Sequence, residues 1–445
     1  MRLRAFAVLV LAALPAIAAA QSPRYVPEFL GPFPAGKINS RGEMVSGIAV
    51  GSATRALVVR AGAPHELLPL PAGMTSSIAL DLNDGGVIVG AVSPSTSPEF
   101  SGRAAAWTPA GSGGYTVRLL GELPGHAISR ATAVNIPGDI VGYSSNGTYR
   151  YPVLFTAPGG VLDLSATGVF DPVDLNDQRV LVDHSFTAKR LDLDTMIAED
   201  LGVPAPPGGP RYVATRAEVI NESGQVAGAA ILATSTSCDR QGARYSDGVG
   251  WEIFSSCGPY NSVSDMNDLG DVIMRLNLAP YVRLEGAGMY RVEDLIVQDI
   301  GHWYVVNSFG LGINNARQIV VWANNQATNQ SGAVLLTPED VTAIADPPAG
   351  APPAALALRA VPNPFQASTS IRFELAAAGA VTLSIHDTAG RLVRRLDAGT
   401  FRRAGSQAMV WNGLDEGRRP VASGIYTCRL DAGGTSRTAR LVRLR

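Results

Sequence analysis

Two short loops of this 445-residue chain each bring several oxygen ligands together. They are DLNDGG at residues 81–86 and DMNDLGD at residues 265–271. Such loops can bind Ca²⁺, but a calcium loop needs acids at regular alternate positions and a distant bidentate glutamate. Here the pattern stops after two or three ligands, and related segments carry Pro137 or Gln178 instead of the acids. We therefore predict no metal site.

Local motifs for catalysis are absent from the sequence. The chain has neither a nucleophile elbow, nor a phosphate loop, nor a His-Glu-x-x-His pattern. No two histidines stand at metal-ligand spacing; they are His65, His126, His184, His302 and His386. We expect no catalytic residue and no cofactor, and interpret His126 as a loop histidine. Distant residues can still meet at the axis of a ring-shaped fold.

The tryptophans and cysteines are better explained by structural roles than by ligand binding or catalysis. Trp107, Trp251, Trp303 and Trp322 could stack on carbohydrate, but such residues more often pack between sheets. Cys238 and Cys257 lie within one repeat of the pattern described below. In an exported protein they can oxidise, so we predict a disulfide between them. Cys428 is then a lone buried thiol.

These residues are placed by a pattern that occurs seven times. An asparagine is followed three residues later by glycine or a substitute, and then by a β-branched run. Successive asparagines are 41 to 52 residues apart, and repeats of roughly 40–50 residues are typical of propeller blades. Each asparagine begins a turn, where its side chain can bond backbone amides. The seven are Asn39, Asn83, Asn135, Asn176, Asn221, Asn267 and Asn314.

Each period holds about four short β-favouring runs, as in a four-stranded blade. We predict an all-β chain with a seven-bladed β-propeller. Eight blades would result from a degenerate copy between Asn83 and Asn135, and six is a further alternative. The segment 25–31 reads as an orphan strand that completes the blade ending at 332–338. Such closure removes exposed sheet edges.

The repeat resembles the HAF-type extracellular repeats of bacteria. Residues 120–144, LGELPGHAISRATAVNIPGDIVGYS, carry the pattern almost whole, and residues 67–90 and 199–228 carry most of it. The fourth, sixth and seventh copies depart from it, with Arg179, Met274 and Arg317 at expected glycine positions or strand ends. The resemblance implies a secreted, propeller-like domain of uncharacterised role, with no catalytic residues to carry over.

The N-terminus has the order of a secretory signal peptide. Residues 1–20 run from two arginines through an apolar stretch to small residues, so we expect cleavage after Ala20. The apolar run is shorter than the ~20 residues that span a bilayer. We expect no transmembrane segment in the mature chain. The predicted destination is the medium or the outer cell surface, after passage through the periplasm.

Composition divides the mature chain into three parts. Residues 21–340 are the expected propeller, 341–358 form a linker rich in proline and alanine, and 359–445 form a second domain. This last part has 14 arginines and six acidic residues, whereas residues 21–358 carry a net charge of −12. Because the arginines are spread through alternating strands, we expect no nucleic-acid binding.

The last part has five to seven short alternating strands, which predict a small Ig-like β-sandwich. It resembles the C-terminal sorting domain of type IX secretion substrates and the Ig-like domain of flagellar hook-cap proteins. That resemblance implies a second transport signal, read by secretion machinery; the alternative is an Ig-like module that only supports the propeller. The motif residues are Pro362, Asn363, Pro364, Phe365, Gly390, Arg391, Trp411, Gly413, Ser423, Gly424, Ile425 and Tyr426.

Three classes of function follow. The first is a secreted or surface-associated noncatalytic binding or scaffold protein, whose propeller face engages an extracellular protein or glycan. The second is a secreted hydrolase or lyase acting on an extracellular polymer. A funnel of carboxylates or histidines at the axis would favour this class, and a smooth apolar axis would count against it. The third is a structural surface-layer component.

Overall fold

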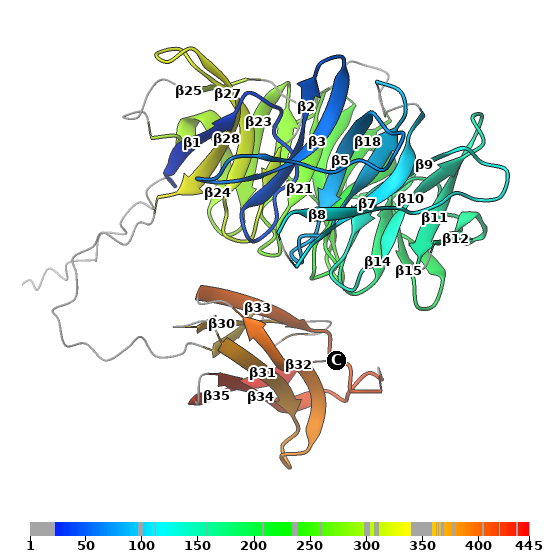
Figure 1. Ribbon diagram of the computed structural model, residues 1–445. Helices are drawn as coiled ribbons and strands as arrows, with labels where there is room; N and C mark the ends of the chain where they lie inside the picture. Colours follow the sequence, from blue (N-terminus) through cyan, green and yellow to red (C-terminus); the bar gives the residue numbers. More distant parts are fainter. Residues whose placement is uncertain are drawn as a thin grey trace, which may run out of the picture.

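The computed structural model describes residues 23–339 and 358–444, except for 97–100, 112, 158, 207–208, 234–238, 259, 298–302, 307–310, 362, 364, 366–368, 376–378, 403–404, 418 and 433–434. The described residues form antiparallel β-strands and two short 3-10 helices, η1 (Ser165–Thr167) and η2 (Val292–Leu295), so the all-β prediction is confirmed (Figure 1). The predicted signal peptide, most of the predicted linker, Pro362 and Pro364 lie outside the described residues.

Within the described part of 23–339 the strands form seven small antiparallel sheets, numbered here in chain order. Sheet 1 has three strands: β2 (Glu43–Val50), β3 (Ala53–Arg60) and β4 (Glu66–Leu67). Sheet 2 has β5 (Ser76–Leu82), β6 (Ile88–Ser93), β7 (Arg103–Pro109) and β8 (Tyr115–Leu119). Sheet 3 has β9 (Ile128–Val134), β10 (Ile140–Ser145), β11 (Arg150–Thr156) and β12 (Gly160–Asp163).

The remaining sheets follow the same order with one exception. Sheet 4 has β13 (Pro172–Leu175), β14 (Val180–Asp183), β15 (Lys189–Asp192) and β16 (Ile197–Asp200). Sheet 5 has β17 (Tyr212–Ile220), β18 (Val226–Leu232), β19 (Arg240–Ser246) and β20 (Gly250–Ile253). Sheet 6 has β21 (Ser262–Met266), β22 (Val272–Leu276), β23 (Ala279–Leu284) and β24 (Gly288–Arg291). Sheet 7 has β25 (Trp303–Val305), β26 (Gly312–Ile313), β27 (Ile319–Asn325), β28 (Gln330–Pro338) and β1 (Tyr25–Gly31).

Sheet 7 joins the two ends of this part of the chain. β1 pairs antiparallel with β28, with Tyr25 opposite Pro338 and Phe29 opposite Val334. The predicted closing strand thus lies where the sequence places it. Sheets 1 and 7 differ from the expected four strands, because the chain before Ile38 in sheet 1 is not a regular strand and the inner strand of sheet 7 is split into β25 and β26.

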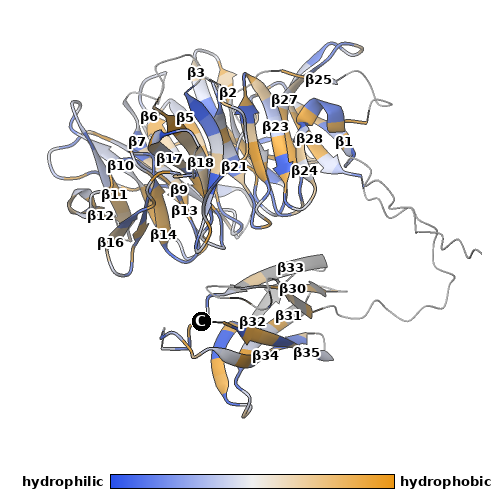
Figure 2. Cartoon of the chain, turned by 180° about the vertical axis from the view of Figure 1, so that it is seen from behind, coloured by the Kyte–Doolittle hydropathy of each residue, from blue (hydrophilic) through white to orange (hydrophobic). Residues whose placement is uncertain are grey.

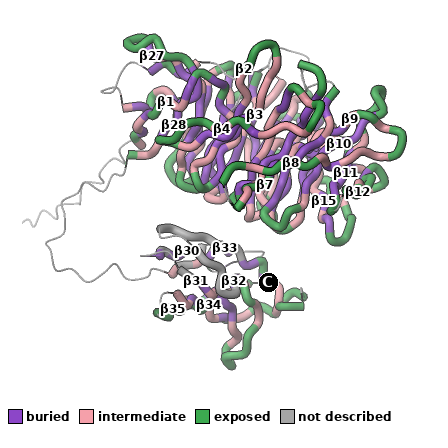
Figure 3. The backbone as a smooth tube through the Cα atoms, viewed as in Figure 1, coloured by how far each residue is buried: buried purple, intermediate pink, exposed green. Residues whose placement is uncertain are grey.

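The core consists of apolar layers between neighbouring sheets. Second strands such as β6 and β10 are buried along their whole length, because both faces of each sheet are covered (Figure 3). Apolar segments lie along the strands of these sheets (Figure 2). Trp107 of sheet 2 packs with Val58 of sheet 1, and Phe155 of sheet 3 packs with Val89 of sheet 2. Similar clusters join each later pair. Sheet 7 in turn packs against sheet 1, so the sequence of contacts closes on itself.

Residues 358–444 form two further sheets. The first has β29 (Leu358–Val361), β30 (Thr369–Leu375) and β33 (Gly405–Trp411). The second has β31 (Gly379–His386), β32 (Leu392–Arg402), β34 (Gly424–Ala432) and β35 (Thr435–Arg443). Trp411 is fully buried between Phe365 and Tyr426, with ring centroids 5.4 and 5.1 Å away.

Several of the predicted motif residues of this part hold the last strand in place. Asn363 donates through Nδ2 to the carbonyl of Arg440 (2.6 Å) and accepts from the amide of Val442 (2.8 Å). The Phe365 amide bonds the Val442 carbonyl at 2.9 Å. Gly413 makes room for Arg443, because a Cβ there would lie 2.7 Å from its Nε. Arg391 closes a turn by binding Asp387.

Cys257 is disulfide-bonded, and Cys428 is a buried free thiol whose pKa is raised to about 12 by burial. Cys238, the predicted partner of Cys257, lies outside the described residues. Among the described residues, no helix is long and apolar enough to cross a bilayer.

Candidate functional site

The seven repeat asparagines form a closed ring of hydrogen bonds. Each donates from Nδ2 to the backbone carbonyl of the next asparagine along the chain. These distances are 3.2 Å from Asn39 to Asn83, 2.7 Å from Asn83 to Asn135, 3.0 Å from Asn135 to Asn176, 3.2 Å from Asn176 to Asn221, 3.2 Å from Asn221 to Asn267 and 3.0 Å from Asn267 to Asn314. The Nδ2 of Asn314 donates to the carbonyl of Asn39 at 3.0 Å and completes the ring.

Each asparagine also shapes its own turn. The Oδ1 of Asn176, for example, accepts the amides of Gln178 (3.2 Å) and Val180 (3.0 Å). The residue three positions after each asparagine has a positive φ, which glycine adopts most easily. Arg179 and Arg317 take this conformation without being glycine, with φ of 63° and 59°. The side-chain Oδ1 of each asparagine thus holds its own turn, and the side-chain Nδ2 links its sheet to the neighbouring sheet.

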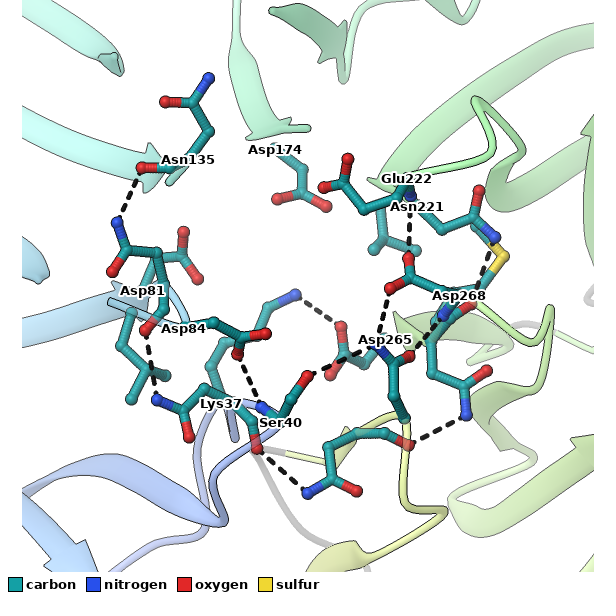
Figure 4. A pocket seen from close by; sticks show the side chains of 18 of the residues that line it. Lys37, Ser40, Asp81, Asp84, Asn135, Asp174, Asn221, Glu222, Asp265 and Asp268 are labelled. Carbon is teal, nitrogen blue, oxygen red and sulfur yellow. Dashed lines mark hydrogen bonds and ion pairs between the residues drawn. The ribbon is translucent and has the colours of Figure 1, made fainter. Parts of the chain in front are cut away.

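The asparagine ring surrounds an axial pocket of about 170 Å³. Residues one position after each asparagine line it, as do residues two positions before all of them except Asn135 and Asn314, and Figure 4 shows side chains converging from different sheets. Together they supply seven carboxylates and one lysine. We call the residues before the asparagines the inner tier and those after them the outer tier. The charged inner tier is Lys37, Asp81, Asp174 and Asp265, and the outer tier contains Ser40, Asp84, Asp177, Glu222, Asp268 and Asn315.

The inner tier is centred on Lys37. Its Nζ lies 2.7 Å from Oδ1 of Asp265. Each aspartate of the tier also accepts a backbone amide from the next sheet: Asp81 from Val134 (2.9 Å), Asp174 from Ile220 (2.9 Å) and Asp265 from Ile313 (3.1 Å). These bonds aim the carboxylates at the axis and fix their rotamers.

Burial governs the protonation of this tier. It raises the pKa of Asp81 to about 7, although the charge of Lys37 acts in the opposite direction. Burial raises the pKa of Asp174 as well. For Lys37, burial alone would lower the pKa, but the charges of Asp265, Asp174 and Asp81 outweigh it and raise the pKa. The lysine therefore stays charged while Asp81 can hold a proton near neutral pH.

The outer tier consists of acids bonded from sheet to sheet. Asp177 accepts the amide of Ile136 at 2.7 Å, and Glu222 accepts the amide of Asp177 at 3.0 Å. Asp268 accepts the amide of Glu222 at 2.9 Å. Asp84 accepts the amide of Ser40 at 2.7 Å. Four carboxylates thus face one another around the pocket without a cationic side chain among the outer-tier residues.

Burial and mutual repulsion disfavour the charged forms of these acids. Burial, followed by the charge of Asp177, raises the pKa of Glu222 well above its ordinary value. Burial also raises the pKa of Asp177 and of Asp268. A bound cation would relieve this repulsion. Chemically the pocket can therefore accept a small positively charged group, or supply a carboxylic acid that still holds its proton near neutral pH.

The two loops considered for calcium contribute to this pocket in a different way. Their acids Asp81, Asp84, Asp265 and Asp268 accept backbone amides from neighbouring sheets. Asp271 binds the guanidinium of Arg317, with Oδ2 to Nε at 2.8 Å. Within the part of the chain that the structure describes, no three histidine, cysteine or acidic residues are grouped so as to hold a metal ion.

Of the described residues singled out in the sequence, His126, Trp107 and Trp251 do not line the axial pocket. His126 contacts the buried Ser144, with Nδ1 2.9 Å from Oγ. Trp107 and Trp251 donate from Nε1 to the carbonyls of Pro69 (2.8 Å) and Leu201 (2.9 Å) in the preceding sheets. These tryptophans pack between sheets and do not form an exposed stacking surface.

Sequence reasoning missed Lys37, Asp174, Asp177 and Glu222. The signal that could have found them is their fixed offset from the repeat asparagines, two positions before or one after. Side chains at equal offsets in a ring of repeats reach the same depth along the axis. Because residue types vary at these offsets, the motif itself does not display them.

A family model described as the FlgD Ig-like domain matches residues 361–436. This match confirms the predicted Ig-like fold of the C-terminal part.

Among solved structures the chain is similar to PorZ of Porphyromonas gingivalis, described as an essential bacterial surface component of the type-IX secretion system. The identity is 12% and the TM-score 0.35, over 90% of this chain and 64% of that one. It is also similar to dimeric latent PorU of the same organism, with 10% identity and a TM-score of 0.18, over 95% of this chain and 34% of that one. This chain thus spans less than two thirds of the length of either protein. No curated protein matches it.

Proposed function

We propose that this chain is a secreted or cell-surface binding protein without catalytic activity, whose axial pocket holds a cationic group of an extracellular protein partner. The observation that carries the proposal is the outer tier, where Asp84, Asp177, Glu222 and Asp268 converge without a cation of their own. A lysine or arginine side chain would neutralise part of this charge. The seven sheets are, in this proposal, seven blades of one propeller built from HAF-type repeats.

The size of the pocket favours a single side chain as the occupant. Sites for drug-sized ligands have volumes of about 300–1,000 Å³, whereas this pocket has about 170 Å³. The asparagine ring keeps the carboxylates in place before binding, so little conformational entropy is lost when the partner arrives. A preorganised acidic pocket also attracts basic partners from a distance and at low salt.

Titration with N-acetylated arginine amide tests this binding, with N-acetylated norleucine amide, which carries no charge, as the matched ligand. We expect the mature chain to bind N-acetylated arginine amide saturably and less tightly as salt is added, because ions screen the attraction. The double variant Asp177→Asn/Glu222→Gln is expected to lose at least tenfold in affinity. Asp294→Asn, at an exposed acid of η2, serves as the control. Absent saturation, or equal affinity in the double variant, would refute the proposal.

A second candidate is a secreted hydrolase or lyase that acts on an extracellular polymer. The carboxylates at the axis favour it, as expected above for this class. The raised pKa of Asp81, about 7, favours it as well, because a general acid must keep its proton near the working pH. Release of reducing ends from polysaccharides or of amines from proteins would support this candidate. Asp81→Asn should then abolish turnover and leave binding of N-acetylated arginine amide intact. The small volume of the pocket makes binding the better-supported function.

We further propose that residues 1–20 direct export and that the C-terminal part carries a sorting signal for type IX secretion machinery. The FlgD Ig-like match and the motif residues support the second statement. Deletion of residues 360–445 should leave the remaining chain in the periplasm. Continued release of that truncated chain would instead favour a supporting Ig-like module without a sorting role.

A further inference from the structure

Three strongly exposed aromatic rings lie at the ends of sheets 3 and 4 that are remote from the asparagine turns. Tyr149 is 65% exposed, Phe170 62% and Phe186 72%. Tyr149 follows β10, and Phe186 follows β14; both strands begin just after an asparagine turn and run away from it. Phe170 precedes β13, which runs toward Asn176. The three rings therefore stand on loops at one end of two neighbouring sheets.

Two of these loops, those of Phe170 and Phe186, are tied to each other by contacts with a buried carboxylate. Asp183, which is fully buried, accepts the amides of Phe170 (3.2 Å) and Asp171 (2.7 Å). It also accepts the hydroxyl of Ser185 at 2.6 Å, next to Phe186. Arg150, next to Tyr149, is close enough to Asp171 to lower its pKa, although burial has the larger, opposite effect. Hydrogen bonds to Asp183 therefore join the Phe170 and Phe186 loops, and Arg150 of the Tyr149 hairpin places its charge near them.

Local contacts hold the Tyr149 hairpin and the Phe170 ring before any ligand binds. Asn146 fixes the Tyr149 hairpin, because its Oδ1 accepts the amides of Thr148 (3.0 Å) and Tyr149 (2.9 Å). Lys189 bonds the carbonyl of Gly168 at 2.6 Å and lies 5.5 Å from the centre of the Phe170 ring. Rings held in this way lose little conformational entropy on binding.

We propose that Tyr149, Phe170 and Phe186 form a platform that binds neutral carbohydrate. A sugar ring presents a face of C–H groups, which gains free energy by covering an exposed aromatic ring. Its hydroxyls point outward at the edge, toward polar side chains. Patches of exposed apolar surface with a polar rim commonly mark a binding site.

The charges around the platform favour a neutral glycan over a protein partner or a charged polymer. Arg150 and Lys189 are balanced by Asp171 and Glu218, which lies 3.5 Å from the ring of His184. The core of a protein interface is depleted of charged residues, but here charges alternate with the rings. The platform uses no residue of the axial pocket, so it goes beyond the cation-binding function proposed above.

Calorimetric titration of the mature chain with cellohexaose, maltohexaose, chitohexaose, laminarihexaose and mannohexaose tests the platform. We expect saturable binding of at least one of them, with little dependence on salt. The double variant F170A/F186A should weaken it by at least tenfold, whereas F186Y should retain it because a ring remains. Y304A serves as the matched control, since Tyr304 is an exposed ring (44%) on β25.

Near-ultraviolet circular dichroism of each variant separates loss of the site from loss of the fold. No saturable binding of any of the five sugars by the wild-type chain would overturn the proposal. So would binding that survives F170A/F186A or is lost equally in Y304A. The axial variant Asp177→Asn/Glu222→Gln should bind the glycan as the wild type does, so the failure of one proposal is distinguishable from the failure of the other.

Discussion

At the scale of single residues, the repeat asparagine combines two functions in one short side chain. Its Oδ1 accepts amides of its own turn, and its Nδ2 donates to the next sheet, as at Asn176 with Val180 and Asn221. Aspartate would keep the acceptor and lose the donor. The seven positions are nearly fully buried, so a lost bond leaves polar atoms without water to replace it.

Replacement of Asn176 by alanine should therefore destabilise the chain strongly. It removes two turn bonds and one bond between sheets, and we expect a loss of about 2–3 kcal/mol of unfolding free energy. Asn146→Ala, which removes bonds within one surface turn, should cost about 1 kcal/mol or less. Urea unfolding followed by tryptophan fluorescence measures both. Equal losses would contradict the importance of the ring.

The axial carboxyls should make stability depend on pH. The folded protein keeps the proton of Asp81 up to a pKa of about 7, whereas the unfolded chain releases it near the ordinary value of 3.8. Between these values the folded state binds more protons, so the free energy of unfolding falls as pH rises and then levels off above about pH 7. Asp81→Asn should flatten this decline, and Asp294→Asn should leave it unchanged. A decline of unchanged slope in Asp81→Asn would show that Asp81 does not hold its proton.

At the scale of elements, the inner strands share a β-bulge three positions before the asparagine. In sheet 3 the register skips Thr132 between Ala131 and Ala133, and sheets 2, 4, 5 and 6 have the same shift. The residue of the second strand that faces this bulge is a glycine in sheet 3, because a side chain there would clash with the bulged strand. A Cβ at Gly142 would lie 1.9 Å from the carbonyl oxygen of Arg130.

Gly142→Ala should consequently displace the bulge or the strand that carries it. We expect a loss of about 1–3 kcal/mol, the usual cost of forcing extra atoms into a packed region. Gly111→Ala is the matched control, because a Cβ at Gly111 meets nothing within 4 Å. Thermal unfolding of the two variants compares them. A similar melting temperature for both would mean that the bulge adapts without cost.

The repeat motif predicts the turns and strands of the backbone, but it does not predict which charged side chains lie at the axis. The period, the turn asparagines and the closing strand could be found because each depends on local residue types. The Nδ2 bond of Asn39 could not, since its acceptor at Asn83 belongs to the next repeat. In the sequence, Arg179 stands at a position where most repeats have glycine. In the structure it takes the glycine conformation and reaches Asp139 of the preceding sheet at 2.6 Å.

At the scale of the whole molecule, the two proposed binding sites lie at opposite ends of the sheets. The acidic pocket opens among the asparagine turns, and the aromatic loops of Phe170 and Phe186 stand at the remote strand ends. Different residues and different physical forces serve the two sites. Salt should weaken the first and leave the second nearly unaffected, so one chain could hold a basic protein and a neutral glycan together.

The pairing of Tyr25 with Pro338 has a consequence for the order of folding. Contacts that close a loop of roughly 300 residues form late, because the chain entropy must be lost before they stabilise the fold. β1 emerges first from any membrane channel that releases the N-terminus first, yet its partner β28 emerges only after the six preceding sheets. Until then β1 has no edge of β28 to pair with, and the ring of sheets stays open. Such a delay suits the export proposed above, in which the chain crosses a first membrane unfolded and becomes compact only on the far side.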